Sequence, residues 1–199
     1  MTRGGVVTVV GAVVALAVLS LASNMMVPGE VEGGHREYSV VRRTLSILLN
    51  SGTAWAGLAV LAGRQARSWW LAALVAVAAA EGALVLHYVL GMALGVFGWG
   101  IWASNLAWFV VAVLFCAPLG VVGHLSRRAD LIGLLGRLTV PVGAVVEPFV
   151  VGHFADRPST WVQHWSDLAA GTLLVLAGLV GVVVVLVLAG RADRRDVGA

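Results

Sequence analysis

Long apolar runs dominate the chain, and short polar pieces separate them. Six of these runs could cross a membrane, because a bilayer core of about 30 Å needs roughly 20 apolar residues in a helix. Helix is the expected structure of each run, since lipid offers no partners to backbone polar groups. The predicted spans are residues 6–23, 45–62, 69–90, 101–125, 131–154 and 168–189. The pattern therefore predicts an all-α fold, a polytopic membrane helix bundle of six transmembrane helices in one domain, residues 1–199. The first run is expected to be a retained span rather than a signal peptide, because five more spans follow.

Three segments are expected to depart from a regular span. The fifth span holds Pro141 and Pro148, and proline lacks the N–H that a helix interior needs, so this span is expected to be interrupted. Residues 24–44 contain Pro28 and several glycines, so they are expected to form an irregular loop. Residues 155–167 are expected to form a turn and a short helical collar before the last span.

Arginine placement predicts the orientation. All 13 basic residues other than histidine are arginine, against 10 acidic residues. With the N-terminus inside, nine arginines fall on the inner side and four on the outer side. Positive residues concentrate in cytoplasmic loops, so both termini are expected in the cytoplasm and the protein in the plasma membrane. The outer pair Arg42 and Arg43 runs against this distribution.

Composition narrows the class of protein further. Hydrophobic residues make up 60% of the chain and charged residues 12%, with a mean hydropathy of +0.95. Soluble domains are about 45–50% apolar and 25% charged, so a water-soluble globule is excluded and the lipid bilayer is the expected surrounding. The formal charge of +3 is spread over short pieces, which gives no reason to expect nucleic acid binding. Cys116 is the single cysteine, so an intrachain disulfide is excluded. No cofactor is expected.

Two glutamates, Glu81 and Glu147, lie inside apolar runs. A charge at the centre of a membrane helix costs at least ~2.5–3.5 kcal/mol, so such an acid is a candidate functional residue. Either could donate a hydrogen bond, carry a proton or act as a general acid; the alternative is a contact that only holds two helices together. Other polar and aromatic residues fall in the same half of the bundle, which predicts a polar pocket in its outer half. These further candidates are Asn50, Trp55, His87, Tyr88, Asn105, Trp108 and His153.

Two further interpretations concern the arrangement of the spans. His87 and His153 fall at similar depth on helices that run the same way, so ligation of one haem by both is geometrically possible. The motif Ala54-Trp55 with Ala59-Val60-Leu61 recurs 53 residues later as Ala107-Trp108 with Ala112-Val113-Leu114. Residues 45–90 and 101–154 could therefore be a duplicated helical hairpin, each with an acid and a histidine in its second helix.

Three resemblances follow from particular residues. The segment Leu49-Asn50-Ser51-Gly52-Thr53-Ala54-Trp55, with Gly63-Arg64 and the fifth span, resembles an uncharacterised family of six-helix membrane proteins of actinobacteria. This resemblance covers about residues 45–190 and implies a fold without a function. The segment Asn105-Leu106-Ala107-Trp108 is similar to the Asn-x-x-Trp-Glu segment of integral-membrane terpene cyclases. Phe109 replaces the acid here, so the acid that this similarity implies would be Glu81 or Glu147. Six helices with both termini inside are also similar to the substrate-binding subunits of modular vitamin importers.

Two functions are consistent with these features. The first is binding or transport of a small, partly apolar molecule in the outer-half pocket, with possible proton coupling through Glu81 and Glu147. The second is a membrane-embedded enzyme acting on a lipophilic, isoprenoid-like substrate, with one glutamate as general acid. Trp55, Tyr88 and Trp108 would then stabilise cationic character in the substrate.

Overall fold

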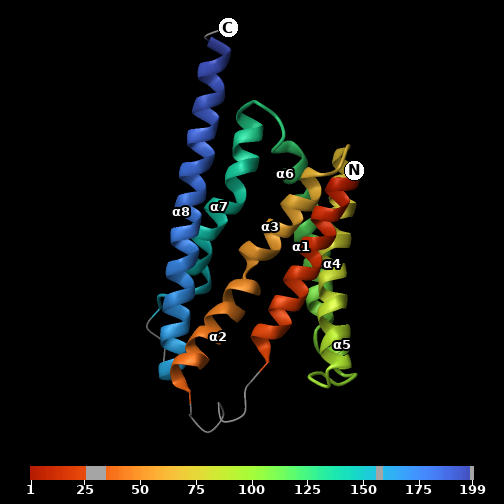
Figure 1. The fold of residues 1–199 in the computed structure, drawn as a ribbon, viewed down its shortest axis with the longest axis vertical. Coiled ribbons are helices and arrows are strands. Elements are labelled where there is room, and N and C mark those ends of the chain that lie inside the picture. Colours follow the sequence, from red (N-terminus) through yellow and green to blue (C-terminus); the bar gives the residue numbers. More distant parts are fainter. Residues whose placement is uncertain (26–34, 156–158, 198–199) are drawn as a thin grey trace.

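The computed structural model describes residues 1–25, 35–155 and 159–197, with side chains as far as Arg191. The described residues form eight helices and no strand (Figure 1). The helices are α1 (Arg3–Asn24), α2 (Arg36–Leu49), α3 (Gly52–Arg64), α4 (Trp69–Ala93), α5 (Ile101–Ser104), α6 (Leu106–Leu125), α7 (Leu131–Val151) and α8 (Trp161–Val197).

The predicted class of fold is confirmed. Within the described residues, α1, α4, α6, α7 and α8 are each long and apolar enough to cross a membrane. The pair α2 and α3 reaches the same length together, with a bend of 41° between the two helices, which allows six spans. Both ends of the chain lie at the same end of the bundle, as an even number of crossings requires (Figure 1). The protein is thus an all-α, multi-pass membrane protein.

The second predicted span, residues 45–62, is wrong in its start and in its continuity. Helix α2 begins at Arg36, inside the segment expected to be an irregular loop, and the span breaks at Asn50 and Ser51. The Ser51 hydroxyl donates to the Leu48 carbonyl at 2.7 Å and accepts from the Ala54 N–H at 3.1 Å, so one side chain serves both helix ends. The charged residues of α2 made it look like a loop, although its other face packs on α8 and α1. Pro28 lies outside the described residues.

The expected interruption of the fifth span is also wrong, because α7 is helical through both Pro141 and Pro148. Each proline removes only one helical hydrogen bond, and neighbouring helices can make such a loss tolerable in a membrane. Here α8 supports α7 closely: a Cβ on Gly178 would stand 2.6 Å from the Pro141 carbonyl oxygen. The helix ends at Val151, followed by Gly152 with a φ of 82°.

Two other boundaries differ from the prediction. The fourth span, expected at 101–125, is divided at Asn105 into the short α5 and the long α6. The last span is longer than expected, because α8 starts at Trp161 and takes in the collar that was predicted to precede it. Helix α8 extends beyond the other helices toward the C-terminus (Figure 1).

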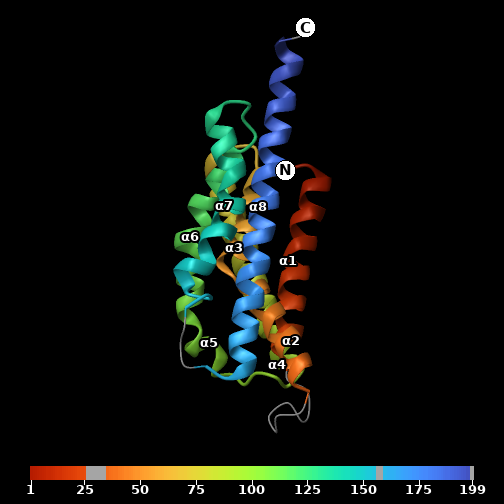
Figure 2. The same ribbon diagram turned by 90° about the vertical axis from the view of Figure 1, so that its left-hand side faces the viewer.

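The helices pack as two groups, which we call the core group (α1, α3, α4, α6) and the flank group (α2, α7, α8). In the core group, a Cβ on Gly63 of α3 would overlap the backbone of Gly120 on α6. A Cβ on Gly120 would in turn overlap the Ala72 backbone and the Ala76 side chain of α4, so three helices pack closely here. In the flank group, α7 and α8 run side by side (Figure 2), and α2 packs on α8. Contacts between the groups are sparser, apart from those of α1 with α2. The broken span therefore begins in one group and ends in the other.

Candidate functional site

A cavity of about 1100 Å³ lies between the core group and the flank group. Its walls are mainly apolar and include Trp108, Phe115 and Leu119 of α6 and Val146 and Val150 of α7. Several of these side chains are exposed: Trp108 keeps 59% of its surface and Val150 keeps 78%. Polar side chains gather around the break between α2 and α3. The cavity therefore has a long apolar part and a polar end.

The structure brings most of the sequence-predicted candidates to this one cavity. Glu81 is the exception, because it is not among the residues that form the wall. The candidates that line it are Asn50, Trp55, His87, Tyr88, Asn105, Trp108, Glu147 and His153. Their role in binding or catalysis stays a prediction, but their proximity in space does not depend on that role.

Glu147 of α7 holds the start of α3. Its Oε1 accepts a hydrogen bond from the Gly52 N–H at 2.7 Å. Its Oε2 accepts from the Thr53 N–H at 2.7 Å and from the Thr53 hydroxyl at 2.5 Å. The first N–H groups of a helix have no partner within the helix, and the helix dipole favours negative charge beside them. Glu147 thus acts as a helix cap supplied by another helix, and it joins the two helix groups at the break.

A chain of hydrogen bonds ties α1 to α2 along the polar end of the cavity. The Ser20 hydroxyl donates to Asn50 Oδ1 at 2.8 Å, and Asn50 Nδ2 donates to the Ser46 carbonyl at 2.8 Å. The Ser46 hydroxyl donates to Asn24 Oδ1 at 2.6 Å. All four of these residues line the cavity, so its polar end is built from side chains that hold one another in place.

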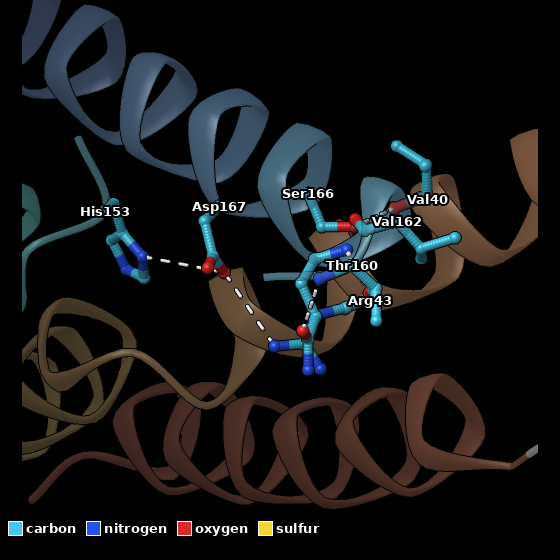
Figure 3. A network of polar contacts seen from close by, with 8 residues as sticks. Val40, Arg43, His153, Thr160, Val162, Ser166 and Asp167 are labelled. Atoms are coloured by element: carbon cyan, nitrogen blue, oxygen red, sulfur yellow. Dashed lines mark hydrogen bonds and ion pairs between the residues drawn. The ribbon is translucent and has the colours of Figure 1, made fainter. Parts of the chain in front are cut away.

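Arg43 of α2 and His153, which follows α7, meet at Asp167 of α8 in the flank group (Figure 3). Arg43 Nη2 and His153 Nδ1 each lie 3.9 Å from Asp167 Oδ1. Close by, the Ser166 hydroxyl donates to the Val162 carbonyl at 2.7 Å and to the Val40 carbonyl at 3.2 Å, which fastens α8 to α2 (Figure 3). Sequence reasoning missed Arg43 and Asp167 as site residues. The sequence did contain one signal for Arg43: the Arg42–Arg43 pair runs against the arginine distribution that predicts the orientation.

An aromatic cluster forms the wall on the side of α4. The Tyr88 ring, 6% exposed, contacts His87, Phe97, Trp102 and Phe109, with ring centroids 5.3 to 6.1 Å apart. The His87 ring also lies 5.6 Å from the Phe97 ring, centroid to centroid. The other histidine, His153, is oriented toward Asp167 on α8. The two histidines are therefore held by different helices, and nothing in this arrangement favours a shared haem.

Glu81 of α4 is half-buried in the core group and does not line the cavity. One of its carboxylate oxygens, Oε1, is buried and has no hydrogen-bond partner among the described residues. The carboxyl group lies near the buried Cys116 thiol of α6. These surroundings fit a contact between α4 and α6 better than a group that meets a ligand.

The proposed duplication of residues 45–90 and 101–154 stays a prediction. In its favour, a helix ends and another begins at Asn50–Ser51 and again at Asn105, the matched polar positions of the two halves. The acids behave differently, since Glu147 caps α3 while Glu81 is not hydrogen bonded to the start of α6 in any contact of the described residues.

A comparison with protein-family models, curated proteins and solved structures finds no match to this chain. Within the described residues, no group of three or more histidine, cysteine and acidic side chains is placed to hold a metal ion. The fold and the cavity together define a multi-pass helical membrane protein with a large, mainly apolar cavity that is partly open.

Proposed function

We propose that this protein binds or transports a small, partly apolar molecule in the cavity between its two helix groups. The observation that carries the proposal is the cavity itself, about 1100 Å³ with apolar walls and a polar end at the broken span. Ligand sites in proteins are typically concave, mostly apolar and provided with a few fixed polar groups. The arginine distribution supports a plasma-membrane location with both termini in the cytoplasm.

Transport is favoured by the way the two groups meet. Many transporters bind their substrate where a discontinuous helix lies between two bundles, and they work by moving one bundle against the other. Here α2 packs in the flank group, α3 packs in the core group, and the break between them borders the cavity. For the groups to move, the contacts of α1 with α2 and the hydrogen bonds of Glu147 to the start of α3 would have to change, whereas the other contacts between the groups are sparser.

Acid catalysis on an isoprenoid-like substrate has less support. Glu147 is the acid at the cavity wall, and both of its oxygens already accept hydrogen bonds from the start of α3. Glu81, the other candidate acid, does not line the cavity. Asn105, which carries the similarity to terpene cyclases, donates to the Ile101 carbonyl within its own helical turn.

The test uses a residue where the cavity can be filled without strain. Gly143 lines the cavity, and a Cβ built on it meets no atom within 4 Å. We expect native mass spectrometry of the purified wild-type protein to show a bound molecule of constant mass, and Gly143→Leu to lose it. Gly11→Leu is the matched control, because Gly11 on α1 is exposed and equally free of neighbours within 4 Å. A wild type without any bound molecule, or a Gly143→Leu variant that keeps it, would contradict the proposal.

A further inference from the structure

The cationic side chain of Arg43 lies at the polar end of the cavity and has an N–H donor without a hydrogen-bond partner among the described residues. Arg43 lines the cavity, and this donor is its buried Nε atom. A guanidinium has five N–H donors and no acceptor. A buried donor without a partner is costly, so such a group is expected to meet an acceptor in the functional state.

Asp167 does not meet this need. The distance of 3.9 Å from Arg43 Nη2 to Asp167 Oδ1 is an ion-pair distance, well beyond the 2.7–2.9 Å of a charge-assisted hydrogen bond. The same carboxylate oxygen is shared with His153 Nδ1, also at 3.9 Å (Figure 3). Asp167 therefore orients the two basic side chains from outside the cavity wall while their donors stay available.

Glu147, the other charged residue of the wall, does not compete for a ligand at Arg43. Its two oxygens accept from Gly52 and Thr53, so its charge is compensated by the start of α3. The neutral amides Asn24 and Asn50 border the same end. This end of the cavity thus offers cationic and neutral donors, which suit an anion better than a cation.

From this arrangement we infer that the molecule bound in the cavity is an amphiphile with an anionic head group, a carboxylate or a phosphate, which Arg43 binds beside His153. The inference rests on the proposed function and adds the chemical class of the ligand. The apolar tail would lie along α6 and α7, against Trp108, Phe115 and Val150. The planar guanidinium of arginine can bind two oxygens of either head group at once.

The test compares three probes that share one alkyl chain: decanoate, decyl phosphate and decanol. Each is titrated against the full-length protein in phosphatidylcholine nanodiscs, with partition into protein-free nanodiscs subtracted. We expect at least one anionic probe to bind roughly tenfold to a hundredfold more tightly than decanol, the range expected for charge-assisted hydrogen bonds. The two anionic probes distinguish a carboxylate ligand from a phosphate ligand.

Variants at Arg43 assign this preference to its side chain. Arg43→Gln should abolish the preference for the anionic probe and leave decanol binding unchanged, while Arg43→Lys should keep part of it. Arg36→Gln is the matched control, an exposed arginine of the same helix that does not line the cavity. Asp167→Asn should tighten binding of the anion, because it removes the carboxylate that attracts Arg43 and His153. This opposite effect keeps the test decisive if Arg43→Gln does not fold.

Two results would overturn the inference and leave the proposed function standing. One is equal binding of decanol and both anions by the wild type. The other is an undiminished preference for the anion in Arg43→Gln. Failure of all three probes to bind the wild type would instead contradict the proposed function itself.

Discussion

The carboxylate of Glu147 on α7 caps Thr53 at the start of α3, accepting its backbone N–H at 2.7 Å and its hydroxyl at 2.5 Å. The two residues are 94 positions apart in the chain. The contact joins the core group to the flank group at the point where the second span breaks. An acid that the sequence marks as a candidate catalyst is thus, in the structure, the group that caps the helix after the break.

Glu147→Gln tests the cap directly. The amide keeps the shape of the side chain, but its NH₂ group turns a donor toward donors of α3, so at least one bond is lost. We expect the variant to be less stable by roughly 1–3 kcal/mol, the range for a hydrogen bond to a charged group or an unsatisfied buried donor. Unfolding in detergent micelles, followed by tryptophan fluorescence, measures this. Glu37→Gln, an exposed acid in the first turn of α2, is the control and should change stability by less. Equal effects of the two variants would argue against the cap.

Thr53 offers a second, independent test of the same cap. Thr53→Val keeps the branched shape but removes the hydroxyl that donates to Glu147, whereas Thr53→Ser keeps the hydroxyl. We expect Val to lower the free energy of unfolding by about 1–2 kcal/mol and Ser to recover most of the loss. In a double-mutant cycle, Thr53→Val and Glu147→Gln should be non-additive, because they remove the same interaction. Additive effects would show that the two side chains contribute separately.

Close backbone packing within the core group predicts a large effect at Gly63. A Cβ there would overlap the backbone of Gly120 on α6, so Gly63→Ala must push α3 away from α6. We expect a loss of roughly 1–3 kcal/mol, as for other overpacked sites, seen as a lower midpoint of thermal unfolding. Gly11→Ala on α1 should leave the midpoint nearly unchanged, because a Cβ there meets no atom within 4 Å. A mild effect at Gly63 would mean that the two helices can separate freely.

The loop between α6 and α7 predicts an acid-sensitive contribution to stability. The hydrogen bond from Arg128 lowers the pKa of Asp130, and the Gly133 N–H that it caps lowers the pKa further. Because the folded pKa lies below the unfolded value of about 3.9, this contribution is present above that value and is lost as pH falls through the folded pKa. Asp130→Asn should flatten the pH profile of unfolding below about pH 4. Asparagine still caps the helix but cannot pair with the charge of Arg128, so stability near neutral pH should fall slightly, as expected for an exposed ion pair. An unchanged profile in Asp130→Asn would contradict this assignment.

The positions of the long helices could be predicted from the sequence, but the breaks within and between them could not. Apolar runs such as residues 69–90 and 131–154 lie close to α4 and α7, because the length and polarity of a run are local properties. Helix α2 was missed because its charged residues make the segment polar on average, although one face of the helix packs on α8 and α1. The predicted interruption of the fifth span was wrong for a related reason. Whether a helix continues through Pro141 depends on its packing against α8. The Ser51-Gly52 pair at the real break is a turn signal that the apolar run around it obscured.

The residues of the candidate site were likewise predicted only in part. Residue types alone singled out Asn50, Glu147 and His153, which the fold brings to one cavity, because polar groups within apolar runs are rare enough to be noticed. Residue types also singled out Glu81, but it lies on α4 of the core group and does not line the cavity. Asp167 was missed because its position beside Arg43 and His153 depends on how α8 lies against α2.

The sequence by itself determined that this chain is a bundle of membrane helices, because the bilayer requires long apolar helices and their residues are contiguous. The tertiary structure decided where a span breaks, which acid caps the broken end and which residues face the cavity. These features depend on helices that meet across many residues of chain, as Glu147 meets Gly52 and Thr53. Their energies come from packing and from hydrogen bonds between helices, which no local pattern of residues records.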